Sequence, residues 1–152
     1  MVMRTIRSVL LAAIASGGAA VTLLSFVPWL HVSATILCFF TCHDTKITGF
    51  EVTGITELGD GYVVAALGFM ITSLAGAILL LPTRTVILPI VIVLAALGTM
   101  VITAFNALNF DSHYQEPTWA LHAEVVLPIV VALCAGALLT LREHANQSDI
   151  AP

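Results

Sequence analysis

The stretch VILPIVIVLAALGTMVITAFNAL, residues 86–108, contains no charged side chain and is the longest of four apolar segments in this 152-residue chain. About 20 residues of α-helix cross the hydrocarbon core of a bilayer, which is roughly 30 Å thick. A segment of this length and composition is therefore typical of a transmembrane helix.

Three further segments have the same character and cover residues 9–27, 62–81 and 121–141. Apolar residues make up 59% of the chain, charged residues make up 9%, and the mean hydropathy is +1.06. A soluble domain carries about 25% charged residues, so these few charges could not cover a water-exposed surface. The sequence predicts an all-α membrane protein, in which residues 1–152 form a single integral domain built on a bundle of four transmembrane helices.

The basic residues predict how this bundle is oriented, because Lys and Arg collect in short cytoplasmic loops. Four arginines fall on one side of the predicted bundle: Arg4, Arg7, Arg84 and Arg142. Lys46 falls on the other side, in the first of two outer loops, residues 28–61 and 109–120. We therefore expect a multi-pass protein of the plasma membrane with both termini in the cytoplasm.

The N-terminus resembles a secretory signal peptide, because Arg4 and Arg7 precede an apolar run. The apolar region of a signal peptide is only about 7–15 residues long. Here the apolar run continues to Pro28, which is long enough to span a bilayer. We therefore expect this segment to be retained as a helix.

The first outer loop contains two runs rich in β-branched and aromatic residues, 31–40 and 46–55, around a short polar turn. Such a pattern predicts a β-hairpin-like extracytoplasmic loop. An isolated hairpin is marginally stable in water, so this one should pack on the helix ends or on a partner. Apolar side chains would supply the contact: Leu37, Phe39, Phe40, Phe50 and Ile55.

Cys38 and Cys42 lie in the same loop, on the oxidising side where disulfides persist. A structural disulfide between them is the favoured interpretation, and unpaired thiols are one alternative. The other alternative is a zinc or copper site, since thiolates and imidazoles bind both metals. Its ligands would come from six residues: Cys38, Cys42, His43, His31, His113 and His122. Apart from such a metal no cofactor is expected, and Cys134 is interpreted as a packing residue within the fourth helix.

Two carboxylates stand at predicted helix starts. Asp60 lies between two glycines and is typical of a helix N-cap. Glu124 lies about one turn into the fourth helix, where the helix dipole favours a carboxylate at the membrane interface. For Glu124 the alternative is a functional carboxylate that works with polar neighbours at the outer face: Asn106, Asn109 or His122.

Small residues recur at four-residue spacing in the predicted helices, for example Gly68, Thr72 and Gly76, and then Ala132, Gly136 and Thr140. Such stripes let helix backbones approach closely in a bilayer. They predict packing within the bundle, which is compatible with a dimer or partner face. Pro128 inside the fourth segment predicts a kink.

The chain contains no familiar catalytic motif, phosphate-binding loop or basic nucleic-acid patch. It also lacks ionisable groups near the middle of any span, which proton or ion transport requires. We therefore expect a non-enzymatic accessory or scaffold subunit of a plasma-membrane or cell-envelope complex. It would contact a membrane-protein partner, or a second copy of itself, through the first outer loop.

Two alternatives to this function stay open. One is an extracytoplasmic metal-binding or redox membrane protein that uses residues 38–43. The other is a small-solute transporter, which would need a hydrated cavity near Asn106, His122 and Glu124.

Two short motifs, Pro-Trp-x-x-Val-Ser at residues 28–33 and Gly-Asp-Gly at 59–61, give the first half of the chain a family resemblance. It resembles small four-span actinobacterial membrane proteins, and this resemblance implies an architecture rather than an activity. The chain departs from that pattern through Cys38 and Cys42, because the loop is usually rich in Gly and Ser. The layout is also similar to that of claudins by analogy only, since their Gly-Leu-Trp motif and wider cysteine spacing are missing here.

Overall fold

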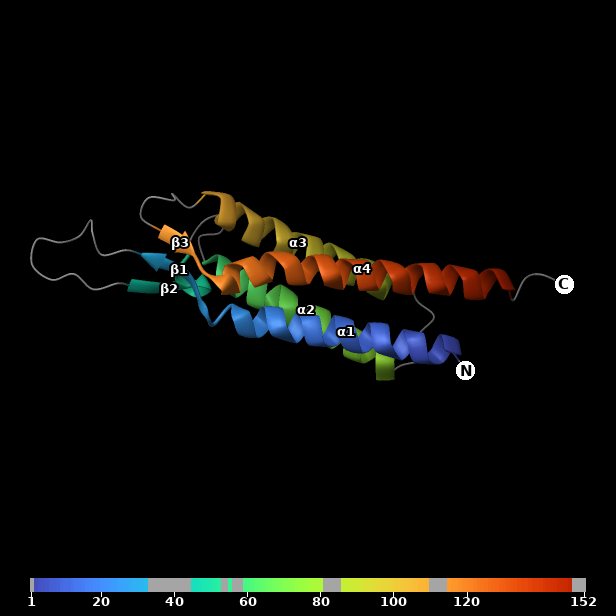
Figure 1. Cartoon of the computed structure of the whole chain (residues 1–152). Coiled ribbons are helices and arrows are strands. Elements are labelled where there is room, and N and C mark those ends of the chain that lie inside the picture. The colour runs from blue at the N-terminus through green and yellow to red at the C-terminus, as the bar shows by residue number, and fades with distance from the viewer. Residues whose placement is uncertain are drawn as a thin grey trace, which may run out of the picture.

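The computed structural model describes residues 2–32, 45–52, 55, 59–80, 86–109 and 115–148. Within these residues the chain forms four long helices: α1 (Val2–Leu24), α2 (Asp60–Leu80), α3 (Ile87–Asn109) and α4 (Trp119–Ser148). Each of them includes a stretch long and apolar enough to cross a membrane. The predicted all-α architecture with four membrane-spanning helices is confirmed (Figure 1).

The helices α1 and α4 are longer than the apolar segments that predicted them. The helix α1 begins at Val2 rather than at residue 9, and α4 continues to Ser148 rather than ending at residue 141. Hydropathy marks only the part of a helix that crosses the bilayer, so polar helix ends escape it. Pro128 lies inside α4, and the helix continues on both sides of it.

The four helices run side by side, and each packs against its neighbour in the sequence, while α1 also packs against α4. The two chain ends lie at one end of the bundle and the β-strands lie at the other, which we call the sheet end (Figure 1). The half of the interior away from the sheet end is an apolar core to which all four helices contribute. Representative buried side chains are Leu11, Ile14, Ile71, Ile92, Val131 and Leu138.

The contact between α1 and α2 depends on small residues. A Cβ atom added to Gly18 would come within 2.8 Å of the Gly68 carbonyl oxygen, and one added to Gly68 would come equally close to that of Gly18. One turn further on, Thr72 Oγ1 donates a 3.3 Å hydrogen bond to the Ala15 carbonyl. The predicted packing stripe is thus used inside the bundle here, whereas at Gly76 and Gly136 an added Cβ would have no described atom within 4 Å beyond the adjacent residues and backbone of its own helix.

The sheet end carries a small antiparallel sheet. Its strands in the described residues are β1 (Pro28–Val32), β2 (Thr45–Thr48) and β3 (Gln115–Pro117), in the order β2-β1-β3. The pairing of β1 with β2 is the hairpin-like arrangement expected from the first loop. The strand β1 begins at Pro28, before the first predicted run, most of which lies outside the described residues, and the 3-10 turn η2 (Gly49–Glu51) interrupts the second run.

The strand β3 joins the sheet from the second outer loop, which the sequence presents only as a short polar link. Three residues are too few to show an alternating pattern, so this pairing could not be predicted. The expected contacts of Leu37, Phe39 and Phe40 lie outside the described residues.

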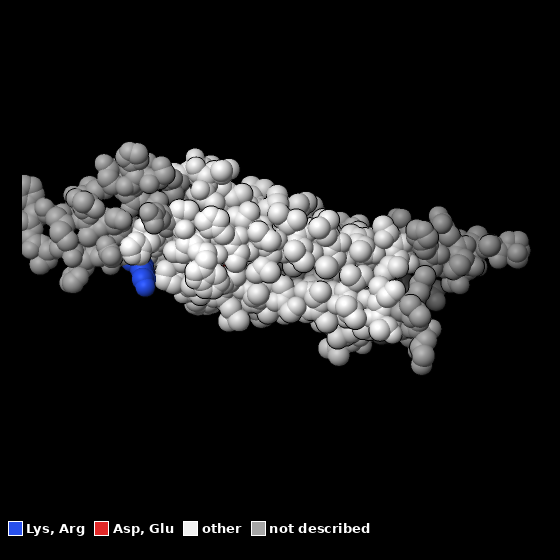
Figure 2. Space-filling view, viewed as in Figure 1, with Lys and Arg blue, Asp and Glu red and all other residues white. Residues whose placement is uncertain are grey.

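The outer surface of the bundle is apolar. Between the two ends, the face shown in Figure 2 carries neither Lys or Arg nor Asp or Glu, and a basic side chain stands out at the sheet end. Several large apolar side chains are more than half exposed: Leu23, Phe69, Leu94, Val101 and Leu133. Such a surface is suited to contact with lipid chains rather than with water.

Candidate functional site

Near the sheet end the interior combines a second apolar cluster, which includes Val21, Leu30 and Leu121, with several buried polar side chains. Five side chains there form what we call the buried polar cluster: Ser25, Asp60, Thr103, Asn106 and Glu124. They come from α2, α3, α4 and the residue after α1, and each is at most 1% exposed. The expected apolar interior is therefore interrupted at this level by two carboxyl groups.

Asp60, the first residue of α2, connects three parts of the molecule. Its carboxyl group accepts the backbone N–H of Ile55, with distances of 3.2 Å to Oδ1 and 3.0 Å to Oδ2. Asn106 Nδ2 of α3 donates to Asp60 Oδ2 at 2.8 Å. The residue therefore ties the loop before α2 to a neighbouring helix, which is a wider role than the helix cap that the sequence predicts.

Glu124 is fully buried, although the sequence favoured an interfacial position at the start of a helix. Ser25 Oγ lies 3.2 Å from Glu124 Oε1, and Thr103 Oγ1 donates to the Glu124 backbone carbonyl at 3.2 Å. The buried positions of α4 recur at helical spacing, at residues 121, 124, 128, 131, 135 and 138. Glu124 belongs to this inward face, but no sequence pattern marks the face, because exposed positions of α4 such as Val126 and Leu133 are apolar as well.

Trp29 of β1 is a neighbour of Glu124 inside the protein. Its side chain is 0% exposed, and its indole N–H lies near the Glu124 carboxyl group. The contact falls outside hydrogen-bonding geometry, however. In the described part of the chain, neither Trp29 Nε1 nor Glu124 Oε2 has a hydrogen-bond partner. Sequence reasoning did not single out Trp29 as a site residue.

Two glycines make room for the Trp29 ring. A Cβ atom on Gly49 would lie 2.5 Å from the indole, and one on Gly61 would lie 2.3 Å from the Gly49 carbonyl carbon. Trp29, Gly49 and Gly61 therefore meet at one place, although they come from three separate parts of the sequence. The Trp29 carbonyl also accepts the backbone N–H of Thr118 at 2.8 Å, which links β1 to the start of α4.

The other predicted polar residues form hydrogen bonds with groups other than the Glu124 carboxyl group. Asn109 is exposed and donates a 2.8 Å hydrogen bond to the Phe105 carbonyl of its own helix. His122 is also exposed, with Nδ1 2.9 Å from the Thr118 carbonyl. Asn106 pairs with Asp60 instead, so the set expected around Glu124 is replaced by Ser25, Thr103 and Trp29.

The cysteine and metal predictions fall mostly on residues that the structure does not describe. Four of the candidates lie outside the described ranges: Cys38, Cys42, His43 and His113. Within those ranges, no group of three or more His, Cys, Asp or Glu side chains is arranged to hold a metal ion. The disulfide and the metal site both stay predictions. Cys134 is a half-buried free thiol packed against the apolar core, which matches its predicted role.

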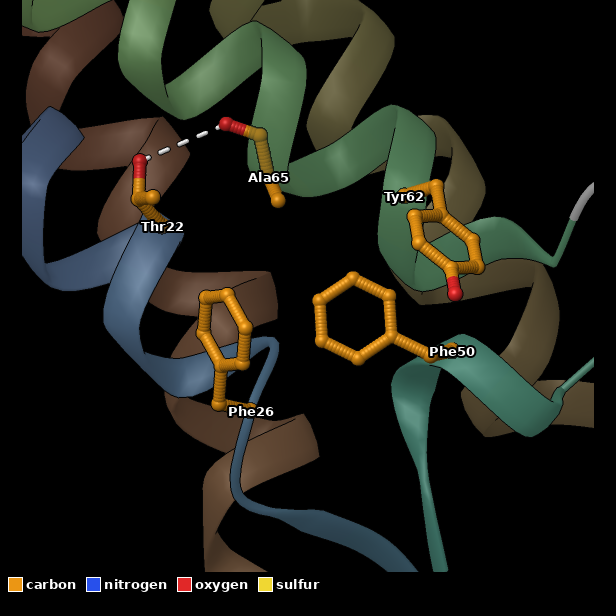
Figure 3. A pocket seen from close by; sticks show the side chains of 5 residues that line it. All are labelled: Thr22, Phe26, Phe50, Tyr62 and Ala65. Atoms are coloured by element: carbon orange, nitrogen blue, oxygen red, sulfur yellow. Dashed lines mark hydrogen bonds between the residues drawn. The ribbon is translucent and has the colours of Figure 1, made fainter.

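Three aromatic rings meet at the outer edge of the same region. The Phe50 ring of η2 lies between the rings of Phe26 and Tyr62, with centroid distances of 4.7 Å and 4.4 Å (Figure 3). Together with Thr22 and Ala65 they line a notch of about 340 Å³ between α1 and α2, which we call the aromatic notch. The expected packing of Phe50 on the helix ends is confirmed.

Comparisons with known proteins give this chain no relative. A scan of protein-family models, a search of the curated proteins and a search of the solved structures find no match. The resemblance to four-span actinobacterial proteins therefore stays a prediction. The buried polar cluster and the aromatic notch are the structural features that bear on function.

Proposed function

We propose that this chain is a non-enzymatic accessory or scaffold subunit of a plasma-membrane or cell-envelope complex, and that it binds a membrane-protein partner at its sheet end. The distribution of arginines predicts that this end lies outside the cytoplasm and that both termini lie inside. The observation that carries the proposal is the aromatic notch, where Phe26 remains 63% exposed and Tyr62 remains 58% exposed. Aromatic side chains are enriched among the residues that dominate protein interfaces.

The parts that present the notch are tied to the helices by backbone and side-chain bonds. The Asp60 N–H donates to the Val52 carbonyl at 2.7 Å, just after η2. The Thr118 N–H donates a hydrogen bond to the Trp29 carbonyl of β1, and the Asn106 side chain donates one to the Asp60 carboxyl group. A surface already held in one arrangement loses less conformational entropy when a partner binds, which favours recognition at this place.

Aromatic residues at this level also occur as a simple interfacial belt, which anchors a protein in the bilayer without any partner. A matched pair of substitutions separates the two roles. Tyr62 in the notch and Phe69 two turns further along α2 are aromatic and similarly exposed, at 58% and 68%. If both rings only face lipid, removing either one should leave the recovery of a partner protein unchanged.

The experiment is purification of the tagged full-length chain from its own membranes in mild detergent, followed by quantification of co-purifying proteins. We expect a stoichiometric partner, with Tyr62→Ala reducing its recovery by about tenfold or more and Phe69→Ala leaving it unchanged. A photo-crosslinking residue at position 62 should form one discrete adduct, and the mass of that adduct tells a foreign partner from a second copy. Absence of a stoichiometric partner, or equal losses for both variants, would contradict the proposal.

A further inference from the structure

The Glu124 carboxyl group and the Trp29 indole meet inside the protein with their hydrogen-bonding capacity only partly used. Both side chains are 0% exposed. Ser25 Oγ lies 3.2 Å from Glu124 Oε1, while Glu124 Oε2 and Trp29 Nε1 have no hydrogen-bond partner among the described residues. A buried donor beside a buried acceptor, neither of them paired, is rare in folded proteins and asks for a reason.

The Ser25 hydroxyl offers that reason, because it has one hydrogen and two acceptors within reach. Ser25 Oγ lies 3.1 Å from the Val21 carbonyl oxygen and 3.2 Å from Glu124 Oε1. When the hydroxyl donates to Val21, its contact with Glu124 requires a hydrogen on the carboxyl group. When it donates to Glu124 instead, the carboxyl group can be ionised, and the Trp29 N–H becomes the available donor for Oε2.

We propose that Glu124 is a proton-binding site whose state is transmitted to the sheet through Trp29. In the proton-bound state, the carboxyl group donates to Ser25 Oγ, the Ser25 hydroxyl donates to Val21, and the indole N–H stays unpaired. On ionisation the proton leaves to solvent, and the Ser25 hydroxyl and the Trp29 N–H both donate to the carboxylate. The site therefore has two hydrogen-bonding states, and they differ in whether Trp29 is attached to α4.

The surroundings of Trp29 allow this change to reach the surface of the sheet end. Trp29 lies in β1, the central strand of the sheet, and its ring packs against the backbone of Gly49 at the start of η2. The next residue is Phe50, the middle ring of the aromatic notch. A displacement of the indole would thus move η2 and change the notch, whether or not the proposed partner exists.

Few other charges face Glu124 from the elements packed around it. The nearest arginine described in α1 is Arg7, eighteen residues before Ser25 and so about 27 Å away along the helix. The helix α3 carries no titratable residue, and the carboxyl group of Asp60 in α2 accepts a hydrogen bond from Asn106. The other titratable groups described at the sheet end are His31 of β1, Lys46 of β2, Glu51 of η2, Tyr62 of α2, Glu116 of β3 and the exposed His122 of α4.

The test uses the two tryptophans of the chain as probe and internal control. The indole N–H signals of Trp29 and Trp119 are followed by NMR in lipid nanodiscs while the pH is varied, and a Trp119→Phe variant assigns them. Trp119 lies five residues before Glu124, but is 68% exposed. We expect the Trp29 indole proton to shift downfield as the pH rises and Glu124 ionises, while the Trp119 signal stays in place. Glu124→Gln should abolish the shift, because an amide cannot ionise.

A second measurement needs no substitution at Glu124. Infrared spectra of the unaltered protein, labelled with ¹³C at the glutamate carboxyl groups, should contain the band of a protonated carboxyl group. That band should disappear with the same midpoint as the Trp29 shift. A Trp29 signal that never moves while the protein is folded, a shift that persists in Glu124→Gln, or an infrared band whose midpoint differs from that of Trp29 would each overturn the proposal.

Discussion

Asn106 in α3 donates a 2.8 Å hydrogen bond from Nδ2 to Oδ2 of Asp60, the residue that begins α2. Asp60 is 0% exposed and Asn106 is 1% exposed. In a bilayer, apolar helix surfaces gain little by leaving lipid for one another, so packing and interhelical hydrogen bonds contribute a larger share of helix association. This bond joins two helices, and through Asp60 it also joins the loop before α2.

The substitution Asn106→Leu should therefore lower the stability of the bundle by about 1–3 kcal/mol, because it leaves the buried Asp60 carboxyl group with one partner fewer. The measurement is thermal or denaturant unfolding in one fixed detergent. Asn109→Leu is the matched control, since Asn109 is exposed and bonds only to its own helix. Equal effects of the two substitutions would show that the bond to Asp60 contributes nothing.

Gly61→Ala should disturb the packing of the sheet on the helices. The new Cβ would lie 2.3 Å from the Gly49 carbonyl carbon, which in turn packs against the Trp29 ring. Such overpacking costs about 1–3 kcal/mol. In a Trp119→Phe background, the fluorescence of Trp29 should shift to longer wavelength, because the ring becomes more hydrated.

The control for this prediction lies in the same helix. Beyond the adjacent residues and backbone of its own helix, no described atom comes within 4 Å of a Cβ added to Gly76, so Gly76→Ala should leave the Trp29 spectrum unchanged. Its stability should stay the same or rise by up to about 1 kcal/mol, since alanine favours helix over glycine. An unchanged spectrum in Gly61→Ala as well would contradict the close contact between α2 and η2.

The orientation of the bundle can be tested by reporter fusions. We expect fusions after Arg84 and Arg142 to read as cytoplasmic, and fusions near Lys46 and His113 to read as external, because positive residues are retained on the cytoplasmic side. An external signal at Arg84 would reverse the topology, and with it the oxidising environment assumed for Cys38 and Cys42.

The pair Cys38 and Cys42 should resist alkylation in freshly isolated membranes and become reactive after reduction, as mass spectrometry can show. A bond that closes so short a loop should contribute toward the lower part of the usual ~2–4 kcal/mol. Replacing both residues by Ser should leave membrane insertion intact, because insertion depends on the helices, and should weaken partner binding through a looser loop. Two freely alkylated thiols would exclude the disulfide and favour the metal site.

The sequence alone determines the four spans and the strand character of the first loop. An apolar segment long enough to span is a property of consecutive residues, since the bilayer sets its length without reference to the rest of the chain. The inward position of Glu124 is not among these features, because most exposed positions of α4 are as apolar as the buried ones.

Only the tertiary structure decides what these residues meet. Asp60 forms a hydrogen bond with Asn106, which lies 46 residues away in the sequence, and Ser25 contacts Glu124, which lies 99 residues away. The strand β3, from the second outer loop, pairs with β1 from the first. The role of Gly49 in η2 likewise depends on Trp29 in β1, because the indole ring occupies the space that a side chain at position 49 would fill. Such contacts depend on how the helices and loops are placed in three dimensions, and no pattern of neighbouring residues specifies that placement.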